Sequence, residues 1–317
     1  MTLKGTISGL ISGYTIKTKL VLAFIALISI PMLVSTFVAS NLITKKLTDI
    51  SHERLRITAA TIKDNLENRT KNLLTEQASY YGRSEDITLS IGIGASEHEY
   101  KRIFSTIKKM LNIDIIEVLD HRGAVLASDI KTTNHRRDAN SYSDLMNSVI
   151  SGADAASFVW TGDGLDYIVA SPISSGGKNI GAFVLGRYMD KEFLGSLKST
   201  TGMNFFLANP KKEIVLSTAE INKNEMIQNS VLTTKGNDSI NLFTGEINKK
   251  LWHLAPLELK DWKGKTLATL YIADSLSALE EDVSRIRYTL MTIASLFLGG
   301  AIFMGIVIAR AIVSPIE

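Results

Sequence analysis

The segment Ile113-Asp-Ile-Ile-Glu-Val-Leu-Asp-His-Arg-Gly-Ala-Val-Leu-Ala-Ser128 predicts a β-hairpin. Two short apolar runs, Ile113–Leu119 and Ala124–Ser128, flank a turn that holds Asp120 and Gly123. Glycine-rich stretches separate three further expected strands, which are Ser157–Thr161, Tyr167–Ser171 and Gly181–Tyr188. The hairpin and the short strands that follow it predict a small antiparallel sheet. A helical pattern at Asp190–Thr200 adds a helix beside this sheet, so the α+β class is predicted.

The same order of elements recurs later in the chain. Strands are expected at Phe205–Leu207 and Ile214–Ser217, joined by a turn, and an apolar strand is expected at Thr266–Ala273. We therefore predict two successive modules, a membrane-distal one at residues 87–189 and a membrane-proximal one at residues 190–274.

A short motif supports this internal repeat. Thr161-Gly-Asp163 is followed by Ser171-Pro-Ile173 in the first module. Thr244-Gly-Glu246 is followed by Ala255-Pro-Leu257 in the second module, at nearly the same spacing. The two segments are expected to occupy equivalent places in the two modules.

The region before the first hairpin predicts helices. The stretch from Asn41 to Tyr80 contains no Pro or Gly, and its apolar residues recur at helical spacing. These residues are Ile43, Leu47, Ile50, Ile57, Ile62, Leu66 and Leu73. We expect a long stalk helix within residues 39–86 and a second helix at Glu97–Leu111.

Two uncharged stretches predict membrane spans. Leu20–Val38 and Tyr288–Ala309 carry no charged residue, and each is long enough as a helix to cross a hydrocarbon layer of about 30 Å. The spans are assigned to residues 20–38 and 288–309. A cleaved signal peptide ending near Ala39 is the alternative for the first stretch, although its apolar run is longer than the usual signal core.

The charge distribution predicts the orientation of these spans. The leader, residues 1–19, holds Lys4, Lys17 and Lys19 and no acidic residue, which accounts for the net charge of +3 of the chain. Residues 39–287 are neutral overall. By the positive-inside rule both termini are expected in the cytoplasm and residues 39–287 outside it.

The last helix carries a regular apolar seam. Its residues step by three and four along the chain: Leu276, Leu279, Val283, Ile286, Leu290, Ile293 and Phe297. Such a seam, running from an exit helix at residues 275–287 into the second span, predicts a homodimer contact that conducts a signal. We assign the relay to Leu276, Leu279, Val283 and Ile286. The alternative is a simple membrane anchor whose periodicity arises by chance.

The composition excludes several classes of function. The chain has no cysteine, which removes disulfide scaffolds and thiolate metal sites, and its charge balance is not that of a nucleic-acid-binding protein. The five histidines show no metal-ligand spacing, and the Gly264-Lys-Thr266 sequence lacks the earlier glycine of a phosphate loop. No metal, no cofactor and no catalytic residue are predicted, so the residues present are not expected to form an enzyme.

One stretch predicts recognition of an anion. Asn134–Tyr142 joins two guanidinium groups to an aromatic ring, the combination that holds a carboxylate by paired hydrogen bonds. The predicted ligand-binding residues are Arg136, Arg137, Tyr142, Trp160, Asp163 and Tyr167. The alternative is a solvated loop beside two core aromatic residues.

These segments together resemble a known family. Asn112–Leu126, Ile168-Val-Ala-Ser-Pro-Ile173 and Gly181-Ala-Phe-Val-Leu-Gly-Arg-Tyr-Met-Asp190 resemble double-Cache extracytoplasmic sensors, in particular the fourth type of cyclase/histidine-kinase-associated extracellular sensor. The closing residues 310–317 resemble the start of a HAMP linker. The resemblance implies two PAS-like modules and a bacterial receptor. The Arg-x-Trp-Tyr signature of amino-acid sensors is absent, so an amino-acid ligand is not implied.

The expected function is that of a transmembrane receptor for a small extracytoplasmic ligand. The second span would relay the signal to a HAMP linker and a cytoplasmic output domain such as a chemotaxis transducer, a histidine kinase or a cyclic-dinucleotide enzyme. The alternative is an assembly protein of the polysaccharide co-polymerase type, which also has two terminal spans. Its long helix usually comes late in the periplasmic domain, whereas here the long helix comes early.

Overall fold

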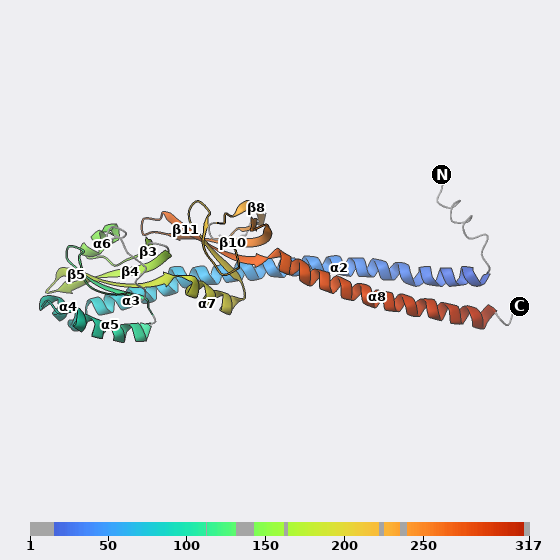
Figure 1. Cartoon of the computed structure of the whole chain (residues 1–317), viewed down its shortest axis with the longest axis horizontal. Coiled ribbons are helices and arrows are strands. Elements are labelled where there is room, and N and C mark those ends of the chain that lie inside the picture. The colour runs from blue at the N-terminus through green and yellow to red at the C-terminus, as the bar shows by residue number, and fades with distance from the viewer. Residues whose placement is uncertain are drawn as a thin grey trace. The chain divides into compact units, whose positions relative to one another are not determined.

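The computed structural model describes residues 16–111, 113–130, 143–161, 164–221, 225–234 and 240–313 (Figure 1). The chain divides into two units. His52–Leu276 forms one of them, called here the sensor unit, and Met1–Ser51 with Ser277–Glu317 forms the other, called the helix pair.

The stalk is a helix with a wide turn inside it. α2 (Ile16–Asp64) continues through a six-residue π-helix, η1 (Asn65–Thr70), into α3 (Lys71–Gly82). Within the sensor unit, the buried residues of the stalk are Leu55, Ala59, Ile62, Leu66, Leu74 and Ala78. The step of eight residues from Leu66 to Leu74 crosses η1, whose wider turn keeps both side chains on the buried side.

The long stalk helix is confirmed, but part of its predicted buried face is wrong. Ile57 and Leu73 are 56% and 54% exposed, while their neighbours Leu55 and Leu74 are buried. The apolar spacing of the sequence allowed either face, and only packing against the sheets selects one.

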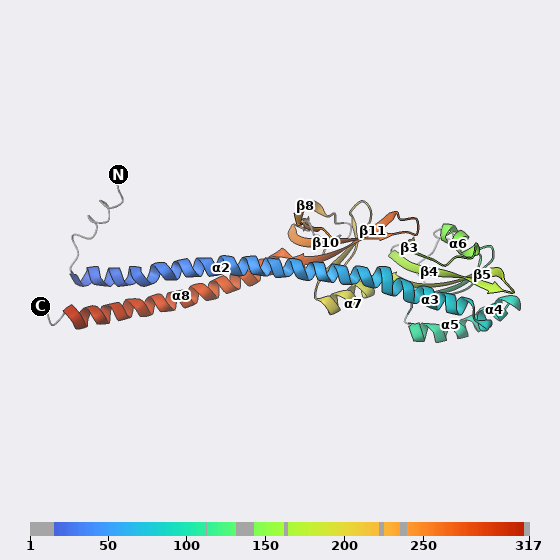
Figure 2. The same ribbon diagram turned by 180° about the vertical axis from the view of Figure 1, so that it is seen from behind.

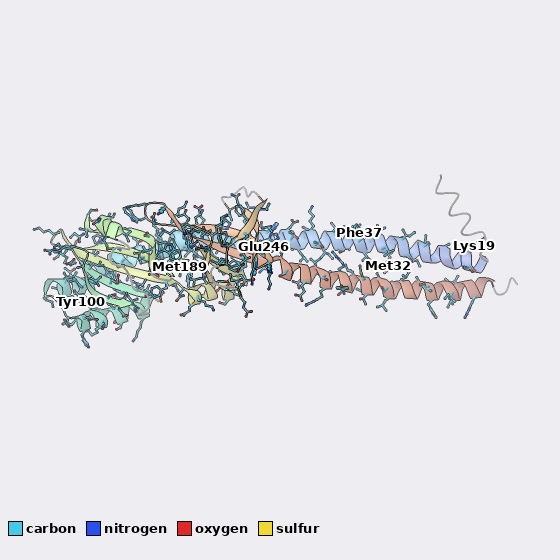
Figure 3. The ribbon with its side chains drawn as sticks, turned by 45° about the horizontal axis from the view of Figure 1, so that its top comes forward. Lys19, Met32, Phe37, Tyr100, Met189 and Glu246 are labelled. Carbon is cyan, nitrogen blue, oxygen red and sulfur yellow. The ribbon has the colours of Figure 1, made fainter. Side chains whose placement is uncertain are left out.

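Two short helices follow the stalk. α4 (Glu85–Gly92), which was not predicted, begins at Ser84, whose Oγ accepts a hydrogen bond from the Ile87 amide. α5 (Glu97–Leu111) confirms the predicted helix. Its residue Tyr100 is buried in the same core as Met189, and both are labelled in Figure 3.

The distal module holds a five-stranded antiparallel sheet in the order β2-β1-β5-β4-β3. Its strands are β1 (Ile115–Asp120), β2 (Val125–Ile130), β3 (Ala155–Thr161), β4 (Gly164–Ser175) and β5 (Lys178–Met189). The predicted hairpin is confirmed as β1 and β2, because Asp120 Oδ1 accepts the amides of Arg122 and Ala124, and Gly123 has a φ of +82°. α6 (Ser143–Ile150) contacts β3, β4 and β5.

The proximal module repeats this plan with one more strand. α7 (Lys191–Thr201) begins at the capping residue Asp190 and leads into a six-stranded sheet of order β7-β6-β11-β10-β9-β8. Its strands are β6 (Asn204–Ala208), β7 (Ile214–Ser217), β8 (Gln228–Thr234), β9 (Leu242–Ile247), β10 (Lys250–Lys260) and β11 (Thr266–Ser275). Leaving β8 aside, the two strand orders are the same, and the α+β class with two modules is confirmed.

The proline half of the sequence repeat has a structural meaning. Pro172 in β4 and Pro256 in β10 lie on equivalent strands, two residues beyond the last pairing of β4 with β3 and of β10 with β9. Proline lacks an amide donor, so it is tolerated where the neighbouring strand has ended.

The Thr-Gly half of the repeat falls at different points of two equivalent strands, β3 and β9. Thr244-Gly-Glu246 lies inside β9 and pairs with β10, whereas Thr161 ends β3. The turn from β9 to β10 is made instead by Asn248 and Lys249, which have φ values of 52° and 57°. Two residues of the first motif, Gly162 and Asp163, lie outside the described residues.

One hydrophobic core joins the stalk to both sheets. We call the sheet faces that pack on the stalk the inner faces, and Val169, Leu185, Leu207 and Leu270 belong to them. Figure 2 shows the stalk passing in front of the strands of the sensor unit. The outer face of the distal sheet packs on α6, and the outer face of the proximal sheet forms a separate cluster around Phe206 and Trp252.

The helix pair contains the two apolar helices. α8 (Leu276–Val313) begins directly after β11 and is one continuous helix. Among the described residues, two helical stretches, Ala26–Gly82 and Glu281–Ile308, are long and apolar enough to include a membrane span.

Candidate functional site

The structure describes two of the six predicted ligand-binding residues. Arg136, Arg137, Tyr142 and Asp163 lie outside the described residues. Trp160 on β3 and Tyr167 on β4 lie on the inner face of the distal sheet. Tyr167 belongs to the large core, and the partly buried Trp160 packs against it. Tyr167 is 6% exposed, and its ring centroid is 4.8 Å from that of Phe158.

Trp160 connects the two modules. Its Nε1 donates a hydrogen bond of 3.0 Å to the carbonyl of Leu267 on β11. A second bond joins the same elements, because the amide of Trp262 donates to Ser157 Oγ on β3 at 3.1 Å. The edge strand of the distal sheet is therefore bonded to the β10–β11 hairpin, and β11 leads directly into α8.

A cleft lies at this connection, and we call it the junction cleft. Its volume is about 600 Å³. It is lined by Leu66, Glu67, Asn68 and Lys71 of the stalk, by Phe158 and Tyr167 of the distal sheet, and by the proximal hairpin residues Leu257–Trp262. Burial raises the pKa of the Tyr167 hydroxyl well above its usual value, so this group stays protonated and can donate or accept a hydrogen bond.

The outer face of the distal sheet holds buried polar groups that the sequence did not single out. Asp166 is fully buried, and Glu117 and Tyr188 are 3% and 2% exposed. Ser128 Oγ donates a hydrogen bond of 3.0 Å to Glu117 Oε1. An acidic residue within an apolar strand, such as Asp166 in Leu165-Asp-Tyr-Ile-Val169, was the available sequence signal.

α6 is fixed to this outer face by polar contacts at its end. The Asn179 amide group on β5 donates to the carbonyls of Val149 and Ile150 at 3.0 and 2.9 Å. The backbone amide of Gly181 donates to Asn179 Oδ1 at 3.0 Å. Since the last carbonyls of a helix have no partner within it, Asn179 holds α6 in place while capping it.

A histidine pair joins the stalk to the proximal sheet. His52 Nε2 lies 3.4 Å from His253 Nδ1, and the rings meet edge to face with centroids 4.4 Å apart. His253 also contacts Thr244 Oγ1 at 3.3 Å and is paired with Asp274 across β10 and β11. Burial, followed by the proximity of His52, lowers the pKa of His253 to about 4 against the opposing effect of Asp274, so the imidazole is neutral near neutral pH.

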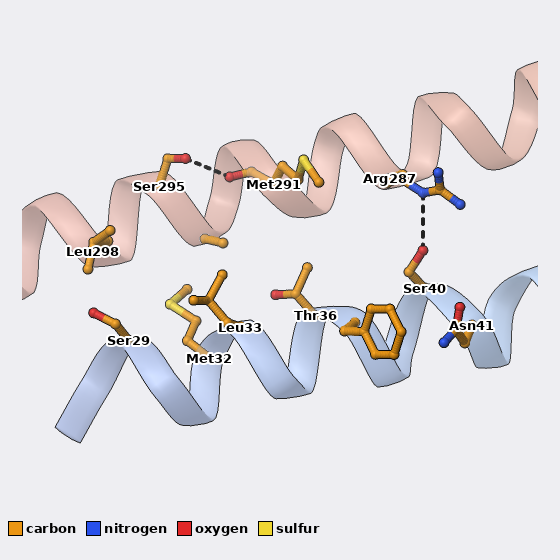
Figure 4. Close-up of a pocket in the computed structure, with 12 residues that line it drawn as sticks. Ser29, Met32, Leu33, Thr36, Ser40, Asn41, Arg287, Met291, Ser295 and Leu298 are labelled. Atoms are coloured by element: carbon orange, nitrogen blue, oxygen red, sulfur yellow. Dashed lines mark hydrogen bonds between the residues drawn. The ribbon is translucent and has the colours of Figure 1, made fainter. Parts of the chain in front are cut away.

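In the helix pair, α2 and α8 face each other across a gap of about 720 Å³ lined mainly by apolar side chains (Figure 4). Arg287 Nε donates to Ser40 Oγ at 3.4 Å beside it. Ala294 and Leu298 of α8 line this gap, whereas Ile293 and Phe297 of the predicted seam are 45% and 65% exposed.

The relay residues Leu276, Val283 and Ile286 are each half-buried, and the side chain of Leu279 lies outside the description.

Among the described residues, no group of three His, Cys, Asp or Glu side chains could hold a metal ion.

The chain was compared with family models, curated sequences and solved structures. A family model described as the double sensory domain of two-component sensor kinases matches residues 50–279. No curated protein sequence matches the chain.

Several solved structures are similar to this chain. The periplasmic domain of Vibrio cholerae LuxQ is 14% identical, with a TM-score of 0.49 over 70% of this chain and 99% of that one. The sensor domain of the V. cholerae histidine kinase DctB is 10% identical, with a TM-score of 0.49 over 73% and 98% of the two chains. The ligand-binding domain of the Campylobacter jejuni chemoreceptor Tlp3, solved with 4-methylisoleucine, is 14% identical, with a TM-score of 0.44 over 74% and 93%.

The family model covers more than half of the chain, and its two-module plan agrees with the two sheets described above. The apolar helices that flank the matched residues are consistent with an inner-membrane receptor. The chain belongs to the double sensory domain family of two-component sensor kinases, the double-Cache extracytoplasmic sensors.

Proposed function

We propose that the chain is a transmembrane receptor whose distal module binds a small extracytoplasmic ligand and whose α8 helix relays the binding to the cytoplasm. Both termini are cytoplasmic in this proposal, and residues 39–287 lie outside. The HAMP linker begins at residues 310–317, and an output domain follows it. The family match supports this receptor over the assembly-protein alternative.

The connection between β3 and β11 carries the proposal. Trp160 and Ser157 bind the hairpin whose second strand continues into α8. A ligand that moves β3 therefore has a short bonded route to the helix. It shifts the balance between two arrangements only by its difference in affinity for them, typically about 1–3 kcal/mol.

The ligand site of this proposal uses Arg136, Arg137, Tyr142 and Asp163, with Trp160 and Tyr167 as aromatic neighbours. Two guanidinium groups favour an anionic ligand, such as a carboxylate. Trp160 and Tyr167, the two described residues of this site, lie together on the inner face of the distal sheet beside the proximal hairpin, which supports a site that can act on that hairpin.

A thermal-shift screen of the detergent-extracted chain tests the ligand site. Carboxylates, amines, amino acids and purines are added in turn, and an anion is expected to raise the unfolding temperature. Arg136→Ala is expected to abolish that shift. Arg122→Ala, in the exposed β1–β2 turn, is the matched control and leaves it intact. An unchanged shift in Arg136→Ala rejects the ligand site.

The homodimer of the proposal is tested by cross-linking. The natural chain has no cysteine, so a single introduced cysteine reports on one position. Ile286→Cys, on the seam, is expected to form a disulfide between two copies in membranes, while the exposed neighbour Arg285→Cys does not. Equal cross-linking at both positions contradicts a seam.

A further inference from the structure

The junction cleft between the two modules has features of a second ligand site. We propose that it binds a small organic cation with an apolar body. The inference goes beyond the proposed sensing of an anion. It rests on Tyr167 and on residues of the stalk and the proximal hairpin, and it uses no residue of the 131–142 segment.

The size and place of the cleft fit a small molecule. At about 600 Å³ it lies within the usual range of ligand pockets, which form preferentially where domains meet. Its floor is apolar, because Leu66, Phe158, Leu257 and Leu259 are buried there. An apolar ligand body would remove further surface of these side chains from water.

Tyr167 lines this cleft, and its hydroxyl has no hydrogen-bond partner among the residues that the structure describes. The hydroxyl oxygen is buried, and the residue is 6% exposed. Nearly all buried polar groups in proteins are satisfied, so a buried hydroxyl without a protein partner is available to accept a hydrogen bond from a ligand. An ammonium group that donates to this oxygen would satisfy it.

The stalk wall of the cleft contains the π-helix. Leu66, Glu67 and Asn68 of η1 line the cleft, and Lys71 follows at the start of α3. Wide helical turns of this kind are rare and occur frequently at functional sites. Here η1 brings three consecutive residues to the same wall.

The charge around the cleft favours a cation. Four carboxylates and two ammonium groups line it, namely Glu67, Asp154, Glu258 and Asp261, with Lys71 and Lys260. Lys260 pairs with Glu258 at 3.0 Å, whereas Glu67 makes no ion pair with any residue that the structure describes. The ring of Trp262 at this rim already attracts a cation, since Lys263 Nζ lies 5.1 Å from its centroid.

Binding of two matched probes to the full chain in detergent tests the site. Phenethylamine carries an ammonium group on an aromatic body, and phenylpropionate carries a carboxylate on a similar body. Intrinsic tryptophan fluorescence is titrated with each. We expect phenethylamine to change the tryptophan fluorescence at concentrations where phenylpropionate leaves it unchanged.

Three variants test the residues. Glu67→Gln, Glu258→Gln and Tyr167→Phe are each expected to weaken phenethylamine binding roughly three- to tenfold. Glu53→Gln, an exposed stalk residue outside the cleft, is the matched control and leaves binding unchanged. Glu67 and Glu258 are both exposed, so their variants are expected to fold.

Several results overturn the proposal. The proposal is wrong if the two probes bind equally well or if phenethylamine does not bind. It is also wrong if Glu67→Gln and Tyr167→Phe both leave phenethylamine binding unchanged. Loss of phenethylamine binding in Arg136→Ala but not in Glu67→Gln assigns the amine to the sensory site instead. Failure of the proposed sensory site has a different signature, since the anion shift then survives Arg136→Ala while the cleft titrations are unaffected.

Discussion

The distal and proximal modules share a strand order, but the distal sheet buries two carboxylates on its outer face, whereas the proximal sheet buries a histidine on its inner face. Asp166 and Glu117 lie on the outer face of the distal sheet, which α6 covers at β3 to β5. His253 lies on the inner face of the proximal sheet, against His52 of the stalk. The outer face of the proximal sheet is closed by an apolar cluster around Phe206 and Trp252.

This difference shows that the same strand order can bury polar groups on either face of a sheet. A buried polar group on the outer face lies on the side of the sheet away from the stalk. A buried polar group facing the stalk couples any change of its charge to the helix. Alternation along a strand decides between the two, because a shift of one residue moves a side chain to the other face.

The largest expected effect compares one glycine from each module. A Cβ at Gly181 would collide with the carbonyl oxygen of Leu119, which is backbone and cannot move away. At Gly245 the nearest atom is Leu254 Cδ1, at 2.8 Å, the end of a flexible side chain. We expect Gly181→Ala to lower the free energy of unfolding by about 3 kcal/mol and Gly245→Ala by about 1 kcal/mol. Urea titration measures both, and equal losses would remove this contrast.

The next effect concerns pH. An unfolded histidine has a pKa of about 6.5, whereas the pKa of His253 is lowered to about 4 in the folded protein. Between these values the unfolded state binds more protons, so stability falls as the pH falls from about 6.5 to about 4 and is constant with respect to this group above 6.5. The loss of folding free energy is about 3 kcal/mol.

His253→Gln is expected to remove this part of the pH dependence, as measured by urea titrations at several pH values. His121→Gln, at an exposed position of the distal hairpin, is the control and retains it. A slope that persists in His253→Gln means that other groups cause the acid sensitivity, and His253 is then no more than a core residue.

Two tryptophans give a smaller contrast. Trp160 Nε1 donates a hydrogen bond to the carbonyl of Leu267, while the buried Nε1 of Trp252 has no partner in the part of the chain that the structure describes. We expect Trp160→Phe to cost about 1 kcal/mol more than Trp252→Phe, since only the first loses a hydrogen bond and the second removes an unsatisfied donor. Thermal unfolding of both variants is the measurement. The reverse order would show that ring volume outweighs the hydrogen bond.

The smallest contrast compares two ion pairs. Lys108 and Asp129 join α5 to β2 at 2.6 Å with side chains 20% and 30% exposed, whereas Lys260 and Glu258 are more than half exposed. Lys108→Met is expected to cost up to about 1 kcal/mol, and Lys260→Met close to zero, because solvent screens the exposed pair. Because the Lys108–Asp129 pair is partly buried, high salt is expected to reduce the cost of Lys108→Met only slightly.

Much of the local structure was predictable from the sequence. The first hairpin, α5 and the strand pairs followed from short-range patterns of turn residues and apolar alternation. The α4 helix was missed because its eight residues are too few for a clear period. The repeated Thr-Gly dipeptide did not mark the same position in the two modules. Thr161 is the last residue of β3, whereas Thr244 lies inside β9.

The candidate sites were less predictable. Trp160 and Tyr167 were recognised as aromatic residues of interest, but their position at the junction of the modules depends on contacts with residues about a hundred positions away. The glycine-rich sequence around Asp166 suggested a turn, whereas Asp166 is buried inside β4, and the histidine pair was not predicted. A single carboxylate or histidine in an apolar stretch gives no indication of what will lie beside it.

The sequence by itself determined the α+β class, the two modules, the apolar helices and the resemblance to the sensor family, because these depend on local periodicity and composition. Only the tertiary structure decided which side of the stalk is buried, with Leu55 in place of Ile57. It also decided that His52 meets His253, 201 residues later, and that Trp160 reaches β11. Periodicity fixes which residues share a face, whereas the partner of that face is chosen by packing between segments that are distant in the chain.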